Sequence, residues 1–186
     1  MKVWAIWIVA LVGAVLSAQG CVGRVIGEGA EKTLGPKGVY WEEIPFAASR
    51  NDKVLEPYTR FVLGGVGNGY GHNVPQEFFS LLIGEFDKAC AAGRLPDDPG
   101  GKTLGINVNV IHYEEADMTD NILGPLEQVV ARVTFVDKDS GKVLAVGNAV
   151  GRTGSTLGRG PDWKARGLAK ALVKWIKDYR YKKEEG

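Results

Sequence analysis

Apolar side chains recur every three to four residues in two stretches of the chain, residues 74–92 and 162–181. Polar and charged residues fill most of the other positions, so both stretches predict amphipathic helices. The first also carries signals of a helix start. Asn73 is a good N-cap, Pro75 falls in the first turn, and Gln76 stands at the capping-box position.

Strand patterns occupy four other stretches. Residues 103–113 and 127–137 alternate between apolar and polar positions, which is typical of half-buried strands. A tight turn at residues 138–141 returns the chain into a hairpin partner at residues 142–151. Residues 58–66 have the aromatic and β-branched composition of a further strand.

The order of these elements is β-α-β-β-β-α. A mostly antiparallel sheet of about four strands, with both helices on one face, would bury both apolar stripes in a two-layer α+β sandwich. The first β-α-β step is compatible with a right-handed crossover that places two strands parallel. We expect this domain to span residues 57–182, with a short tail at residues 183–186.

The N-terminal 20 residues predict a secretory signal peptide. Lys2 is the only charge before Arg24, residues 3–18 are almost entirely apolar, and small or mildly polar residues lead to Cys21. A positive start, an apolar run of about 7–15 residues and a small-residue exit are typical of such signals. A membrane-spanning helix needs roughly 20 apolar residues, so this run is short for one.

The residues that lead into Cys21, Leu16-Ser17-Ala18-Gln19-Gly20, resemble a bacterial lipobox. In proteins with that motif the cysteine thiol receives diacylglycerol before the signal is removed. The resemblance implies a lipid anchor, which several acyl chains would make stable because each buried methylene contributes ~0.8 kcal/mol. The same pattern also fits ordinary signal cleavage that leaves Cys21 as a free thiol, or an uncleaved anchor.

The residue after the cysteine bears on the choice of membrane. In Gram-negative lipoproteins an aspartate at that position tends to retain the protein in the inner membrane, and here it is Val22. For a Gram-negative host the resemblance implies the outer membrane, facing the periplasm. Residues 21–56 are then a lipidated N-terminus and a glycine-containing tether. Residues 39–41 and 44–46 are too apolar for a solvated linker, so they could pack on the domain as a short strand.

Charge excludes one class of partner. Without Lys2 the chain has equal numbers of basic and acidic residues, whereas a nucleic-acid-binding domain needs a basic excess, so we expect no nucleic-acid partner. The distribution is uneven, because every charge from Glu114 to Glu127 is acidic and residues 162–186 are mainly basic. If Cys21 is acylated, Cys90 has no intramolecular partner and no disulfide supports the fold.

The sequence contains no motif that indicates catalysis or metal binding. Residues 64–71 are rich in glycine between a strand and a helix, but they lack the Gly-x-Gly-x-x-Gly spacing of a phosphate-binding turn. His72 and His112 are not spaced as metal ligands. Cys90 lies among apolar helix residues, which indicates a small buried side chain. We therefore expect no enzymatic activity, no cofactor and no metal site.

The layout resembles a group of bacterial lipoproteins of unknown function. It shares with them a signal with a lipobox, a strand–helix opening, a long hairpin that turns at residues 137–144, a glycine-rich loop and a closing amphipathic helix. It is also similar to small α/β domains of envelope proteins such as the curli-secretion lipoprotein and the N-terminal domain of TolB. The resemblance covers most of the chain after the signal, and it implies an envelope component rather than a reaction.

These observations predict a non-enzymatic accessory or scaffold in envelope assembly, transport or secretion, which binds protein partners or itself. The expected contact surfaces are the edges of the sheet, the glycine-rich loop at residues 151–161 and the basic side of the last helix. The candidate contact residues are Gly158, Arg159, Lys174, Lys177 and Arg180. The alternative is a small-ligand or cell-wall-binding module that uses Tyr113, Arg132 and the glycine-rich loops.

Overall fold

The computed structural model describes residues 35–47, 49, 52–69, 71, 74–114, 127–153 and 160–181. The predicted signal peptide, Cys21 and the tail at residues 183–186 lie outside these ranges. The described chain forms β1 (Lys37–Ile44), β2 (Tyr58–Asn68), α2 (Gln76–Ala92), β3 (Lys102–Tyr113), β4 (Gln128–Asp137), β5 (Val143–Arg152) and α3 (Pro161–Arg180).

The strands form one five-stranded mixed sheet in the order β1-β5-β4-β3-β2. Strands β2 and β3, which flank α2, are parallel, and the other three pairings are antiparallel. The α+β class is therefore confirmed, and so is the parallel pair at the first β-α-β step. The predicted count of about four strands is one too low.

The additional strand is β1, which lies N-terminal to residue 57 in the segment interpreted as a tether. It pairs with β5 over its whole length. Its side chains point alternately to the two faces of the sheet, and both sets include apolar residues. Tyr40 is half-buried on the helix side, whereas Val39 and Trp41 on the opposite face are 46% and 47% exposed. This mixed pattern explains why the sequence indicated only a short apolar segment.

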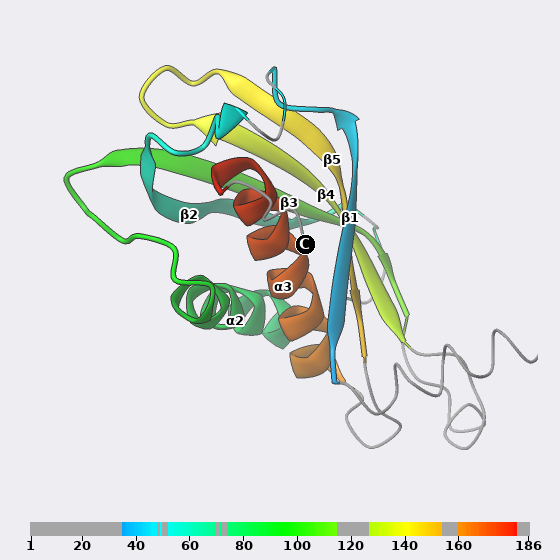
Figure 1. Ribbon diagram of the computed structural model, residues 1–186. Coiled ribbons are helices and arrows are strands. Elements are labelled where there is room, and N and C mark those ends of the chain that lie inside the picture. Colours follow the sequence, from blue (N-terminus) through cyan, green and yellow to red (C-terminus); the bar gives the residue numbers. More distant parts are fainter. Residues whose placement is uncertain are drawn as a thin grey trace, which may run out of the picture.

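Helix α3 runs along the concave side of the sheet, and α2 lies beside it (Figure 1). Contacts join α3 to β1, β5 and β4, whereas α2 contacts α3 and β2. The apolar core fills the space between the sheet and the helices. Its largest fully buried apolar side chains are Trp175, Phe78, Phe86, Phe135, Leu55, Leu82, Leu104, Ile106, Leu168, Leu172 and Ile176.

Trp175 of α3 fixes β1 to the rest of the core. Its ring stacks on Tyr40 at 4.7 Å between centroids and meets the edge of Phe135 at 4.7 Å. Its indole Nε1 donates a hydrogen bond of 2.8 Å to Glu42 Oε1. A buried indole needs such an acceptor, so this contact specifies the position of β1 as well as stabilising it.

Glycines allow the backbone of α3 to lie directly on two strands. A Cβ atom at Gly38 of β1 would overlap the backbone nitrogen of Ala171 and the carbonyl of Gly167. A Cβ atom at Gly151 of β5 would overlap the backbone nitrogen of Leu168 in the same way. No side chain fits at these positions without moving the helix away from the sheet.

A buried ion pair holds the beginning of α3. Lys164 Nζ lies 2.5 Å from Glu127 Oε2, and the two residues are 2% and 4% exposed. The same ammonium group stands 4.4 Å from the centre of the Tyr113 ring. Removing one partner of such a pair leaves an uncompensated buried charge, so the pair fixes α3 against the ends of β3 and β4.

The glycine contact gives the first prediction. We expect Gly38→Ala to lower the free energy of unfolding by about 1–3 kcal/mol, because the methyl group forces α3 away from β1. The matched control is Gly84→Ala in α2, where an added Cβ has no atom within 4 Å. That change should raise stability by roughly 0.5–1 kcal/mol through helix propensity. Urea denaturation of the full chain measures both, and an unchanged Gly38→Ala protein would contradict the close contact.

Candidate functional site

Two of the predicted contact residues lie together in the structure. Lys174 and Lys177 are exposed on α3 and line a groove between α2 and α3. Gly158 and Arg159 lie outside the described residues. Arg180 lies on the same helix, but its guanidinium group is engaged elsewhere.

The groove has a volume of about 590 Å³ and is formed by the facing sides of the two helices. Helix α2 contributes Glu85, Lys88, Ala89, Ala92 and Gly93, and α3 contributes Arg166, Lys170, Val173, Lys174, Lys177 and Asp178. The basic residues of α3 follow one another at three- or four-residue steps, which places them on one side of the helix. The small residues at the end of α2 leave the space between the helices open.

The carboxylates of the groove are already engaged. Glu85 accepts hydrogen bonds from Lys88 Nζ at 2.8 Å and from Arg166 Nε at 3.0 Å. The bond from Lys88, followed by that from Arg166, lowers the pKa of Glu85 despite its burial. Asp178 accepts a hydrogen bond of 2.5 Å from the Tyr40 hydroxyl. Glu85 is thus paired with two cations of the same chain, whereas Asp178 is bonded to a neutral hydroxyl and keeps its negative charge in the groove.

The basic residues of the groove are engaged unequally. Lys170 Nζ donates a hydrogen bond of 3.0 Å to the carbonyl oxygen of Pro36. The side-chain ammonium groups of Lys174 and Lys177 make no hydrogen bond or ion pair with another described residue. Five basic side chains line the groove against two carboxylates. The groove thus combines a positive rim with an apolar floor around Val173, and it is suited to an anionic group that carries an apolar part.

Arg180 has a structural role in the fold. Its Nη1 donates to the carbonyl oxygens of Leu55 at 2.7 Å and Glu56 at 2.9 Å, and also to that of Tyr58. These carbonyls belong to the turn that leads into β2. The guanidinium group therefore ties the end of α3 to that turn through its Nη1 atom.

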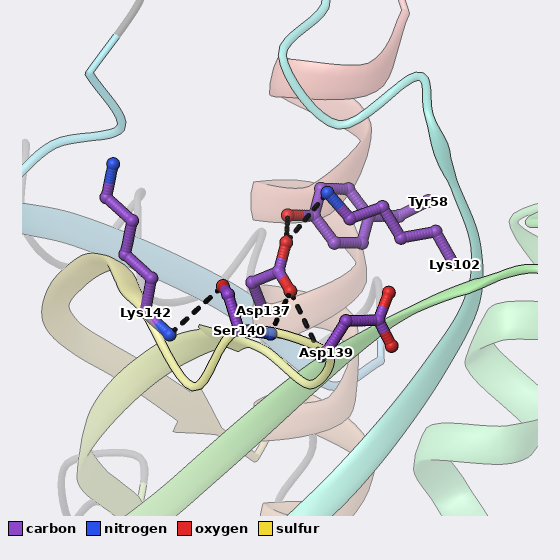
Figure 2. Close-up of polar contacts among 6 residues, drawn as sticks. All are labelled: Tyr58, Lys102, Asp137, Asp139, Ser140 and Lys142. Atoms are coloured by element: carbon purple, nitrogen blue, oxygen red, sulfur yellow. Dashed lines mark hydrogen bonds and ion pairs between the residues drawn. The ribbon is translucent and has the colours of Figure 1, made fainter.

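A second polar cluster lies where β2 and β3 begin and β4 ends (Figure 2). The Asp137 carboxylate lies 2.7 Å from Lys102 Nζ and accepts a 2.7 Å hydrogen bond from the Tyr58 hydroxyl. It also accepts bonds of 3.0 Å from the backbone N–H groups of Asp139 and Ser140. The cluster joins three strands and closes the predicted hairpin turn.

The surroundings of Asp137 determine its ionisation. The bond to Lys102, then those to Tyr58 and the Ser140 backbone, hold the pKa of the Asp137 carboxyl well below its usual range. Burial, followed by the bond to Asp137, raises the pKa of Tyr58 to about 12. A carboxylate with four donors around it is a structural anchor rather than a free base or metal ligand.

The residues of the alternative ligand site do not converge. Tyr113 is buried on the helix side of the sheet, where its ring meets the edge of Phe78 at 5.4 Å. Arg132 alternates with the buried residues of β4 and projects from the opposite face. There it forms an ion pair of 2.7 Å with Glu43, whose pKa it lowers together with Asn148. The two residues therefore cannot contact one small ligand.

Among the described residues, no group of three or more His, Cys, Asp or Glu side chains could hold a metal ion. The helices α2 and α3 are not apolar and long enough to cross a membrane. Burial raises the pKa of the Cys90 thiol to about 12, which makes it a poor nucleophile.

The sequence identified one wall of the groove but not the other. The row of basic residues on α3 is visible as a pattern, whereas the contribution of Glu85, Lys88 and Ala92 depends on how α2 packs against α3. Nothing in the sequence of α2 alone distinguishes these residues from an ordinary solvated helix surface.

The Asp137 cluster gives the second prediction. The pKa of the Asp137 carboxyl in the folded chain lies below its unfolded value of about 3.9. The stabilisation that this carboxylate provides is therefore present above about pH 3.9, the unfolded value, and is lost as the pH falls further. We expect the wild-type chain to lose more stability than Asp137→Asn between about pH 5 and about pH 2. The exposed Asp139→Asn should keep the wild-type profile. Parallel profiles for wild type and Asp137→Asn in denaturation series would contradict this assignment.

Removing the phenol hydroxyl isolates one bond of the same cluster. We expect Tyr58→Phe to lower the free energy of unfolding by about 1.5–3 kcal/mol at neutral pH, because the lost hydrogen bond ends on a charged acceptor. The aromatic ring stays in place, so the core keeps its packing. Urea denaturation measures the loss, and a change below ~0.5 kcal/mol would show that the bond contributes little.

Comparisons with known proteins place few constraints on this chain. No protein-family model matches it, and no curated protein matches it. Among solved structures it is similar to the PelC dodecamer from Paraburkholderia phytofirmans, with 14% identity, a TM-score of 0.48, and coverage of 78% of this chain and 99% of that chain. It is also similar to lipoprotein GNA1162 from Neisseria meningitidis, with 16% identity, a TM-score of 0.39, and coverage of 64% and 95%. Similarities this distant carry no argument about function.

Proposed function

We propose that this chain is a lipid-anchored protein of the bacterial envelope that catalyses no reaction and acts by binding a protein partner. The observation that carries the anchor is the N-terminal sequence, in which a charged start and an apolar run end in Gly20-Cys21. The binding role is supported by the open groove between α2 and α3, in which the ammonium groups of Lys174 and Lys177 have no partner among the described residues.

The polar clusters of the domain support binding rather than catalysis. Asp137, Glu85 and Glu127 each face a cation of the same chain at 2.5–3.0 Å. A general base or nucleophile must instead be free to contact a substrate. In the basic groove, five basic side chains outnumber two carboxylates.

The edge of the sheet offers a second open surface. Strand β1 stands at the edge, and Val39, Trp41 and Ile44 on it are 46%, 47% and 57% exposed. Natural proteins usually protect such an edge, and exposed apolar residues on it are typical of contact surfaces. A partner strand or a second copy of the chain would cover this apolar edge.

The proposal extends to location and process. Because Val22 rather than an aspartate follows Cys21, the mature protein would be sent to the outer membrane of a Gram-negative host and face the periplasm. It would serve there as an accessory or scaffold in envelope assembly, transport or secretion. A role of this kind requires an anchor and a contact surface but no active site.

The anchor is tested by metabolic labelling with a radioactive fatty acid. We expect label on the wild-type chain and on Cys90→Ala, but none on Cys21→Ala, because Cys21 is the residue directly after the predicted signal peptide. Membrane fractionation should place the labelled chain in the outer membrane. A soluble, unlabelled wild-type product would contradict the proposed anchor.

A further inference from the structure

We propose that the groove between α2 and α3 binds an acidic segment of the partner protein that inserts an apolar side chain between the helices. The inference rests on the proposed partner-binding role, for which it names the site and the chemistry of the ligand. It follows from the charge, the floor and the dimensions of the groove.

The charge of the groove calls for an acidic ligand. Glu85 is paired with Lys88 and Arg166, whereas Asp178 accepts only the neutral Tyr40 hydroxyl and keeps its charge. The ammonium groups of Lys174 and Lys177 form no ion pair with another described residue. Five basic side chains line the groove against these two carboxylates, so its charge is positive. Carboxylates on a ligand would balance this excess, and the complementarity would also steer the approach of the partner.

The floor of the groove calls for an apolar side chain. The apolar side chains that line the groove are Ala89 and Ala92 of α2 and Val173 of α3, and none of them is large. The hollow of about 590 Å³ falls within the range of small-molecule pockets, roughly 300–1,000 Å³. It can therefore receive a side chain such as Leu or Phe. An anchor of that kind, surrounded by charge pairs, is the usual composition of an interface centre and its rim.

The dimensions and surroundings favour a narrow polypeptide over a membrane surface. The groove follows α3 from Arg166 to Lys177, which corresponds to roughly 16 Å at 1.5 Å per residue. That length matches about three turns of a bound helix. A flat anionic bilayer could not enter a groove between two helices.

The test measures direct binding of a synthetic peptide to the full chain in phosphatidylcholine nanodiscs. The probe is a fluorescent amphipathic peptide of about 11 residues with Glu on one side and Leu on the other, a length that matches the groove. A peptide with Gln in place of every Glu is its control. Fluorescence anisotropy from about 50 to about 300 mM salt reports affinity and its electrostatic component.

Three variants separate the contributions. The double change Lys174→Glu with Lys177→Glu removes the positive rim and should weaken binding of the acidic peptide about tenfold or more. Ala92→Phe fills the floor without changing charge and should weaken it by a similar factor. Lys142→Glu, an exposed lysine of the β4–β5 turn, should leave affinity unchanged. Circular dichroism and thermal unfolding establish that each variant is folded.

The outcomes decide between specific and unspecific binding. Tight binding of the acidic peptide alone, lost in both groove variants, supports the proposal. Wild-type affinity in Ala92→Phe would overturn it, because the attraction would then be surface charge without insertion. It would also be overturned if the acidic peptide failed to bind, or if phosphatidylglycerol vesicles bound in its place. Lipid labelling of Cys21 is measured in a separate experiment. A failure of peptide binding in the groove would therefore not bear on the proposed anchor, and a failure of labelling would not bear on the groove.

Discussion

The direct contact between the backbone of α3 and the sheet is the constraint on which the rest of this domain depends. Gly38 and Gly151 leave no Cβ atom between strand and helix, so α3 lies directly on β1 and β5. At that distance Trp175 can reach Tyr40 and Phe135 at once, and its indole can donate to β1. The edge strand is thereby held by the helix as well as by its pairing with β5. A larger separation would weaken all of these contacts together.

The same contact determines the character of the groove. Because the apolar side of α3 is used against the sheet, its basic row must face α2 and the solvent. The groove carboxylates are then drawn into internal bonds, with Glu85 bound by Lys88 and Arg166. Two lysines further along the helix, Lys174 and Lys177, form no ion pair with another described residue. The binding surface is thus a consequence of how the core is packed.

Periodicity predicted most of the elements because their inner and outer positions differ clearly. In β4, for example, buried residues alternate strictly with more exposed ones, and the hairpin to β5 was evident from its turn. Strand β1 was underestimated because apolar residues occupy both of its faces, with Trp41 pointing outwards and Tyr40 inwards. Its sequence therefore lacks a clear alternation of apolar and polar residues. Lys164 shows a second way in which the sequence pattern fails. The pattern places it on the polar side of α3, yet it is 2% exposed, because Glu127 and Tyr113 surround its charge. Partners from distant segments are not visible in a local pattern.

The basic residues of α3 differ in whether their side chains are bonded within the chain. This difference, rather than their charge, distinguishes residues that support the fold from residues that are open to a partner. Arg180 belongs to the same basic pattern as Lys174 and Lys177, but it donates to three backbone carbonyls of the turn before β2. Replacing Arg180 would remove these bonds and the link between the end of α3 and that turn. A change at Arg180 is therefore expected to affect the fold as well as any partner. Lys174 and Lys177 have no such obligation within the described chain, so a loss of binding after their substitution can be attributed to the groove.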